Sequence, residues 1–207
     1  MGTIKLLFIG DSITESGKRE DPEEIGISYV RIIHDYLITT YPQKKFNITN
    51  KGISGNRITD LASRWQQDVI EPNPDYVSIS IGINDVWRQL DRPEIEQVDA
   101  EEFEKIYKEL LTRVKKHTNA RIILMEPTVI EEDLQAQGNQ MLKIYVKVVN
   151  EMANQFEAII VPTHQAFVQY LEKNNGYKLT TDGVHMNSAG NMLMATTWLK
   201  AVEHHLK

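Results

Sequence analysis

Two short segments from opposite ends of the chain carry the residue types needed for nucleophilic acyl transfer. The first is Gly-Asp-Ser at residues 10–12, where the apolar run of residues 4–9 stops. The second is Asp-Gly-Val-His at residues 182–185. A serine hydroxyl is a weak nucleophile at neutral pH, so it needs a base and a group that orients the base. We expect Asp182 to hold one imidazole nitrogen of His185 while the other nitrogen faces Ser12.

Two further segments could provide hydrogen-bond donors for the same reaction. They read "GISGNR" at residues 52–57 and "GIND" at residues 82–85. Acyl transfer places negative charge on a carbonyl oxygen, and prearranged N–H groups stabilise that charge. The backbone N–H of Gly55, the side-chain amide of Asn84 and the backbone N–H of Ser12 are therefore the predicted oxyanion donors.

Each pattern also has a plainer structural interpretation. Gly-Asp-Ser suits any turn from a strand into a helix, because glycine permits unusual dihedral angles and Asp11 can cap the helix. Gly55 could simply be a turn residue, Asn84 could cap a short helix, and His185 could be an ordinary loop histidine. The functional interpretation rests on the four segments meeting at one place.

The elements between these segments predict how they meet. Short apolar strands alternate with longer amphipathic helices, which is typical of a parallel sheet covered on both faces. The loops that follow parallel strands lie at one edge of such a sheet, where ligands bind. The sequence therefore predicts a three-layer α/β/α protein. The expected strands are 6–9, 46–49, 76–81, 121–125 and 158–161, and the expected helices are 27–40, 58–70, 100–116, 140–156 and 188–205.

Composition restricts the function further. The chain has 207 residues, of which 41% are hydrophobic and 25% charged, and this predicts a single domain over residues 1–207. A net charge of −6 disfavours nucleic acid and anionic membranes as partners. The absence of cysteine excludes thiol nucleophiles and disulfides. We find no signal peptide and no apolar run of about 18 residues, so we expect a cytoplasmic protein with small-molecule partners.

The four segments, in this order and at these intervals, resemble the GDSL or SGNH hydrolase family of serine esterases. The resemblance covers nearly the whole chain and implies that Ser12, Asp182 and His185 are catalytic. It also implies that Ser12, Gly55 and Asn84 form the oxyanion hole, and that neither a metal nor another cofactor is needed. The fold it implies is a flavodoxin-like five-stranded parallel sheet with strand order 2-1-3-4-5.

A narrower likeness lies in the middle of the chain. The stretches "NKGISGNRITDLASRWQQDVI" and "DYVSISIGINDVWRQLD" are similar to bacterial acetyl xylan esterases and related carbohydrate deacetylases. The likeness implies that the substrate is an acetyl ester, such as an acetylated sugar. The sequence has no broad apolar lid helix of the kind found in long-chain lipases, which also favours a short acyl group.

Several residues are candidates for contact with the substrate. An indole face at Trp87 suits a sugar ring, and Arg88 opens a charged segment, 88–99, that we interpret as a rim loop. Each has an alternative: Trp87 could be packing material, Arg88 could pair with Asp91, and a Glu-Pro pair could merely end a strand. The full set of candidates is Asp11, Trp87, Arg88 and Glu126.

Other functions remain open at this stage. Within the same chemistry, the substrate could be a lysophospholipid, a thioester or an aryl ester. A divalent-metal phosphoesterase could use Asp11, Asn84, Asp85 and His185. A non-catalytic sugar-binding module could keep the same sheet, whereas a nucleotide-binding module is disfavoured because the first strand lacks Gly-x-Gly-x-x-Gly. The sequence leaves open whether the chain forms a homo-oligomer.

Overall fold

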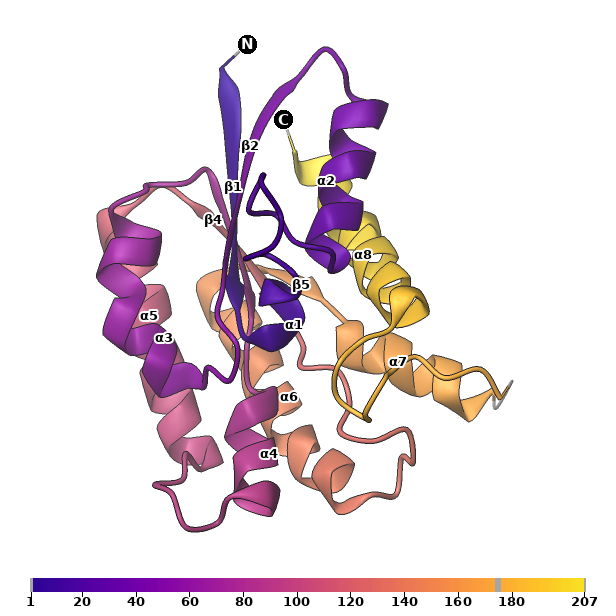
Figure 1. Cartoon of the computed structure of the whole chain (residues 1–207). Coiled ribbons are helices and arrows are strands. Elements are labelled where there is room, and N and C mark those ends of the chain that lie inside the picture. Colours follow the sequence, from indigo (N-terminus) through magenta and orange to yellow (C-terminus); the bar gives the residue numbers. More distant parts are fainter. Residues whose placement is uncertain (1, 174–175, 207) are drawn as a thin grey trace.

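Five parallel strands form one sheet in the order β2-β1-β3-β4-β5 (Figure 1). This is the predicted strand order, and it is confirmed. The computed structural model describes residues 2–173 and 176–206. The strands are β1 (Thr3–Gly10), β2 (Lys45–Gly52), β3 (Tyr76–Ser80), β4 (Arg121–Met125) and β5 (Ile159–Val161).

Helices cover both faces of the sheet, as Figure 1 shows. On one face α2 packs against α8, and α7 lies beside α8; on the other, α5 packs between α3 and α6. The short helices α1 and α4 lie at the carboxyl edge of the strands. The helices are α1 (Ser12–Glu15), α2 (Tyr29–Thr40), α3 (Ile58–Trp65), α4 (Ile83–Asp91), α5 (Ala100–His117), α6 (Gln137–Phe156), α7 (Thr163–Glu172) and α8 (Ser188–Val202).

The layers are held together by apolar side chains along one face of each helix and by two buried tryptophans. In α5, buried side chains recur at three- and four-residue spacing from Phe103 to Val114, and Asp99 caps the helix by accepting a hydrogen bond from the Glu102 N–H. Trp65 donates its indole N–H to the Leu110 carbonyl, which joins α3 to α5. Trp198 donates to the Ser78 hydroxyl, which joins α8 to β3. Helices thus pack on both faces of the sheet through buried apolar side chains.

The five expected helices are present, with small differences at their ends. Two of them finish in a different helical form: α3 continues as a π-helix at Gln66–Ile70, and α8 continues as a 3₁₀ turn at Glu203–His205. Within the described chain, no helix is both long and apolar enough to cross a lipid bilayer.

Three helices lie outside the five main expected ones, although the structural interpretations of Gly-Asp-Ser and of Asn84 each allow a short helix. These are α1, α4 and α7. The most consequential is α4, because it contains Arg88 to Asp91, the first part of the predicted rim loop, and this part of the prediction is wrong. The charges along residues 88–99 are typical of a loop, but Val86 and Leu90 recur at helical spacing, and the chain is helical as far as Asp91. The irregular connection is therefore confined to residues 92–99.

Candidate active site

The carboxyl ends of three neighbouring strands bring three of the four segments together. Gly10 at the end of β1 is in register with Gly52 in β2 and with Ser80 in β3. The chain after β2 stays close to β1, because the Ile53 N–H donates to the Gly10 carbonyl over 3.1 Å. Ser12, Gly55 and Asn84 thus follow strands that end at the same level of the sheet.

The fourth segment completes a chain of hydrogen-bonded side chains. The Oγ of Ser12 lies 2.8 Å from Nε2 of His185. On the other side of the ring, Nδ1 of His185 lies 2.7 Å from Oδ2 of Asp182. The Ser12–His185 contact joins residues 173 positions apart in the sequence. The geometry allows the imidazole to exchange a proton with the serine hydroxyl while the carboxylate fixes the orientation of the ring.

The Asp182 carboxylate is held by its own turn. Its Oδ1 accepts hydrogen bonds from the backbone N–H groups of Val184, at 3.0 Å, and His185, at 2.8 Å. Partial burial acts to raise the pKa of Asp182, but the hydrogen bonds from the His185 ring and from these two N–H groups outweigh it. The pKa therefore lies below its ordinary value, and the side chain is an anion at neutral pH.

The predicted oxyanion donors lie on two segments that hydrogen bonds tie together. Gly55 has a φ of +80°, a left-handed conformation that glycine adopts without strain. Asn84 is buried, and its Nδ2 donates to the carbonyl of Asn56 over 3.1 Å. A second link runs from the Ile58 N–H to Oδ1 of Asp85, at 3.0 Å. The Asn84 amide is thus fixed against the loop that contains Gly55.

Two aspartates adjoining these donors are almost inaccessible to solvent. Asp11 is 1% exposed, and its Oδ1 accepts a hydrogen bond from the Ile13 N–H that caps α1. Burial raises the pKa of Asp11 to about 6 and that of Asp85 to about 7. The structure therefore places Asp11 as a support for the turn at Ser12, and its contact with substrate stays a prediction.

Trp87 is a substrate-binding candidate that the structure brings beside His185. Its ring centroid lies 6.0 Å from that of His185, in an edge-to-face arrangement. The Arg88 guanidinium lies 4.8 Å from the Trp87 ring centroid and also forms an ion pair with Asp91. Arg88 therefore pairs with Asp91, as the structural interpretation predicts. It also lies over the Trp87 ring, so this pairing is compatible with a place beside the substrate.

The Glu126 carboxylate forms its hydrogen bonds with residues other than Ser12, Asp182 and His185. It is buried at the end of β4, where Oε1 accepts a hydrogen bond from Asn150, at 2.8 Å, and Oε2 accepts one from the Gln165 N–H, at 3.2 Å. The carboxylate thus joins α6 to the first turn of α7. This geometry favours the structural interpretation of Glu126.

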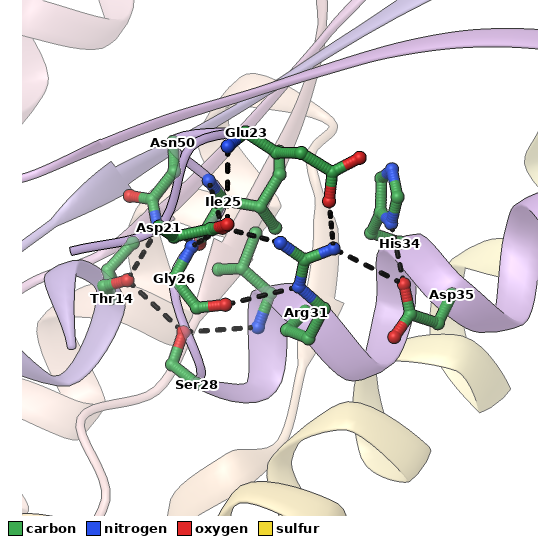
Figure 2. Close-up of polar contacts among 11 residues, drawn as sticks. Thr14, Asp21, Glu23, Ile25, Gly26, Ser28, Arg31, His34, Asp35 and Asn50 are labelled. Atoms are coloured by element: carbon green, nitrogen blue, oxygen red, sulfur yellow. Dashed lines mark hydrogen bonds and ion pairs between the residues drawn. The ribbon is translucent and has the colours of Figure 1, made fainter. Parts of the chain in front are cut away.

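One residue that supports the turn at Ser12, Asn50, is not among those predicted from the sequence. Asn50, buried in β2, donates from Nδ2 to the carbonyls of Thr14, at 2.7 Å, and Ile25, at 2.8 Å. Its Oδ1 accepts a hydrogen bond from the Gly52 N–H. Figure 2 shows Asn50 between α1 and the following loop. The available indication is the alternation along β2, which places Asn50 on the same buried face as Ile48 and Gly52, because a buried amide needs partners.

The loop of residues 16–28 is folded around an acidic side chain. Oδ2 of Asp21 accepts hydrogen bonds from the N–H groups of Ile25, at 3.0 Å, and Gly26, at 2.9 Å, and forms an ion pair with Arg31 (Figure 2). These backbone bonds, that of Gly26 above all, lower the pKa of Asp21 to about 2, and Arg31 adds to the effect. The loop is thereby anchored to α2, the helix that packs on α8.

The residues proposed for a metal-dependent phosphoesterase are not arranged as a ligand set. Across residues 2–173 and 176–206, no group of three or more His, Asp or Glu side chains lies where it could hold a metal ion. Asp11 and Asp85 are buried and accept hydrogen bonds from the backbone instead.

The fold and the site together define an architectural class: a three-layer α/β protein with a serine–histidine–aspartate chain at the carboxyl edge of its sheet. Residues 8–193 match the GDSL-like Lipase/Acylhydrolase family. The chain belongs to this family. This membership confirms the prediction that the protein is a carboxylic ester hydrolase.

Individual relatives are similar over nearly their whole length. An acetylxylan esterase of Geobacillus stearothermophilus is 38% identical over 205 residues, which cover 96% of this chain and 93% of the relative. The crystal structure of Axe2, an acetylxylan esterase from the same organism, superposes with a TM-score of 0.89 at 38% identity, covering 96% of this chain and 93% of Axe2. Solved catalytic mutants of Axe2 replace a serine, an aspartate or a histidine with alanine. LAE5, an α/β hydrolase from the metagenome of Lake Arreo in Spain, superposes with a TM-score of 0.89 at 35% identity, covering 96% and 94% of the two chains.

Proposed function

We propose that this protein hydrolyses short-chain esters, chiefly acetyl esters of carbohydrates, with Ser12 as nucleophile, His185 as general base and Asp182 as its orienting group. The observation that carries the proposal is the pair of contacts from Ser12 Oγ to His185 Nε2, at 2.8 Å, and from His185 Nδ1 to Asp182 Oδ2, at 2.7 Å. A neutral imidazole in this arrangement donates from Nδ1 to the anionic carboxylate, which leaves Nε2 free to accept the serine proton.

In the first half of the reaction Ser12 acquires the acyl group. Oγ attacks the ester carbonyl carbon while its proton passes to Nε2 of His185. The carbonyl oxygen becomes an oxyanion, which the N–H groups of Ser12 and Gly55 and the Asn84 amide stabilise. The carbon–oxygen bond to the alcohol then breaks, and the proton on Nε2 passes to the departing alkoxide oxygen.

In the second half water releases the acid. Nε2 of His185 takes a proton from a water molecule as the water oxygen attacks the acyl carbon. The same donors stabilise the second oxyanion, which collapses as the bond to Oγ breaks, and the proton on Nε2 returns to Ser12. Asp182 stays anionic and stabilises the imidazolium that forms in each half.

The carbohydrate acetate substrate is inferred from two observations. Trp87 lies edge-to-face with His185, so its ring is available to the alcohol part of an ester bound at Ser12. The 38% identical relative from Geobacillus stearothermophilus is an acetylxylan esterase. A longer acyl chain would need an apolar channel beside Ser12, and the preference for acyl length is therefore part of the test.

The proposal is tested with p-nitrophenyl esters of acetic to dodecanoic acid and with an acetylated xylo-oligosaccharide. We expect the acetate to be the best p-nitrophenyl substrate and Ser12→Ala to lose about a thousandfold or more in kcat. Ser63→Ala, at an exposed serine on α3, is the matched control and should keep wild-type activity. Equal rates for Ser12→Ala and the wild type would refute the role of Ser12, and a preference for dodecanoate would refute the short-chain assignment.

A further inference from the structure

A second carboxylate, outside the proposed reaction, contacts the segment that contains Asp182 and His185. Glu132 lies in the loop of residues 126–136, between β4 and α6. Its Oε1 accepts three hydrogen bonds: from the Leu179 N–H at 2.8 Å, the Thr180 N–H at 2.8 Å and the Thr180 hydroxyl at 2.6 Å. One carboxylate oxygen therefore gathers three donors from residues 47 and 48 positions further along the chain.

These donors belong to buried residues. Leu179 is 2% and Thr180 5% exposed, so water does not readily replace Glu132 as their partner. A buried N–H without an acceptor destabilises the conformation that buries it, and hydrogen bonds to an ionised acceptor are about twice as strong as neutral ones. Glu132 is thus a strong local determinant of where residues 179 and 180 lie.

A backbone contact joins the same two loops nearer to the histidine. The N–H of Glu131 donates to the carbonyl of Gly183 over 2.7 Å. Gly183 has a φ of +93°, and a side chain there would have its Cβ 3.3 Å from the Glu131 Cα. The approach is therefore close enough to favour glycine at position 183, between Asp182 and His185.

The segment from Leu179 to Asn187 is closed on itself, so a constraint at its start reaches the histidine. The Asn187 N–H donates to the Leu179 carbonyl over 2.9 Å, and the Thr181 N–H donates to the His185 carbonyl over 2.8 Å. Thr180 also forms an antiparallel bridge with Met186. A shift of residues 179 and 180 would therefore move the His185 backbone as well.

The loop that carries Glu132 is itself held firmly by α6. Asn139, which is 2% exposed, accepts a hydrogen bond from the Ile130 N–H at 2.9 Å. Its Nδ2 donates to the carbonyls of Glu131, at 3.0 Å, and Asp133, at 2.8 Å. Buried side-chain bonds on both sides of Glu132 thus fix the backbone from which its side chain extends.

We propose that Glu132 is a positioning residue, which holds the Asp182–His185 segment so that Nε2 of His185 stays within hydrogen-bond distance of Ser12 Oγ. This inference rests on the proposed function of Ser12 and His185. Displacing a catalytic group by about 1 Å can cost about a hundredfold in rate, so the loss of this anchor affects turnover more than binding. Glu132 itself does not contact the reacting atoms.

The test compares Glu132→Ala with Glu132→Gln on p-nitrophenyl acetate. Glu132→Ala should lower kcat by about tenfold to a hundredfold with KM within about twofold of wild type. Glu132→Gln keeps a side-chain oxygen that can accept the same three bonds, so we expect it to retain at least about a third of kcat. Glu109→Ala, at an exposed position on α5, removes the same charge far from the site and should behave as wild type.

A merely structural role would give a different result. A lower melting temperature for Glu132→Ala with wild-type kcat at 25 °C would overturn the proposal. If Glu132→Ala does not fold, Thr180→Val is the variant to use. It removes only the hydroxyl donor and keeps the volume of the side chain nearly constant. We expect its kcat to fall about threefold with KM unchanged. Wild-type kcat for Thr180→Val would then overturn the proposal.

The same assays separate this inference from the proposed function. Activity of Ser12→Ala at the wild-type rate would refute the proposed function, whatever the Glu132 variants do. An inactive Ser12→Ala together with a fully active, folded Glu132→Ala would refute only the positioning role.

Discussion

At the scale of single residues, Asp85 combines burial with an incomplete set of hydrogen bonds. Its side chain is 0% exposed and Oδ1 accepts the Ile58 N–H, but Oδ2 has no hydrogen-bond partner in the described part of the chain. Burial raises its pKa from 3.8 to about 7, because an unpartnered anion is costly in an apolar interior. A proton on Oδ2 removes that cost, so the folded protein carries Asp85 largely neutral below pH 7.

This shift predicts how stability changes with pH. The folded protein binds a proton on Asp85 that the unfolded chain releases, so the stabilisation is present in acid and is lost as the pH rises through about 7. Asp85→Asn keeps an oxygen for the Ile58 N–H and carries no charge at any pH. We expect it to lose less stability than the wild type between pH 5 and pH 8.

Urea denaturation at the two pH values measures this difference. Asp11 also has a raised pKa, about 6, and remains in both proteins; its charge helps to raise the pKa of Asp85, so the measured difference includes the repulsion between the two carboxylates. An Asp85→Asn protein whose free energy of unfolding changes with pH as steeply as that of the wild type would contradict the assignment.

At the scale of elements, the loop of residues 16–28 connects the helix of Ser12 to the face of the sheet covered by α2. Its conformation depends on Asp21, which accepts hydrogen bonds from two backbone N–H groups and pairs with Arg31 (Figure 2). Lys18 adds a link to the next segment of the site by donating to the Gly52 carbonyl over 2.6 Å. The loop is therefore an ordered support for Ser12.

Replacing Asp21 tests that description. We expect Asp21→Ala to expose the N–H groups of Ile25 and Gly26 and to speed their hydrogen exchange by about tenfold or more, because both lose their acceptor. Glu20→Ala, at an exposed neighbour, is the control. Unchanged exchange of these two amides in Asp21→Ala would show that other contacts order the loop.

The elements also explain which predictions from sequence succeed. Long amphipathic stretches such as 100–116 predict helices well, because the apolar side chains recur along one face. The four-residue α1 and the nine-residue α4 are too short for that periodicity to stand out, and α4 carries charges that resemble a loop. The role of Glu132 could not be predicted, because its partners are fixed only by the fold.

At the scale of the whole molecule, the site exists because four segments separated by most of the chain meet at one edge of the sheet. Periodicity predicts the class of the fold, but it does not say which strands are neighbours. The strand order came from the resemblance of the four motifs to a known family, and the structure confirms it. The same motifs identified Ser12, Asp182 and His185, which the structure joins by two hydrogen bonds.

The most direct test of the proposed function is the site at which a fluorophosphonate attaches. The reagent reacts with a serine only where a base activates the hydroxyl and donors stabilise the oxygen on phosphorus. We predict that intact-mass and peptide analysis will find one adduct, on Ser12, that Ser12→Ala will not be labelled, and that His185→Ala will be labelled at least about a hundredfold more slowly. An adduct on another residue, or labelling of Ser12→Ala at the wild-type rate, would contradict the account.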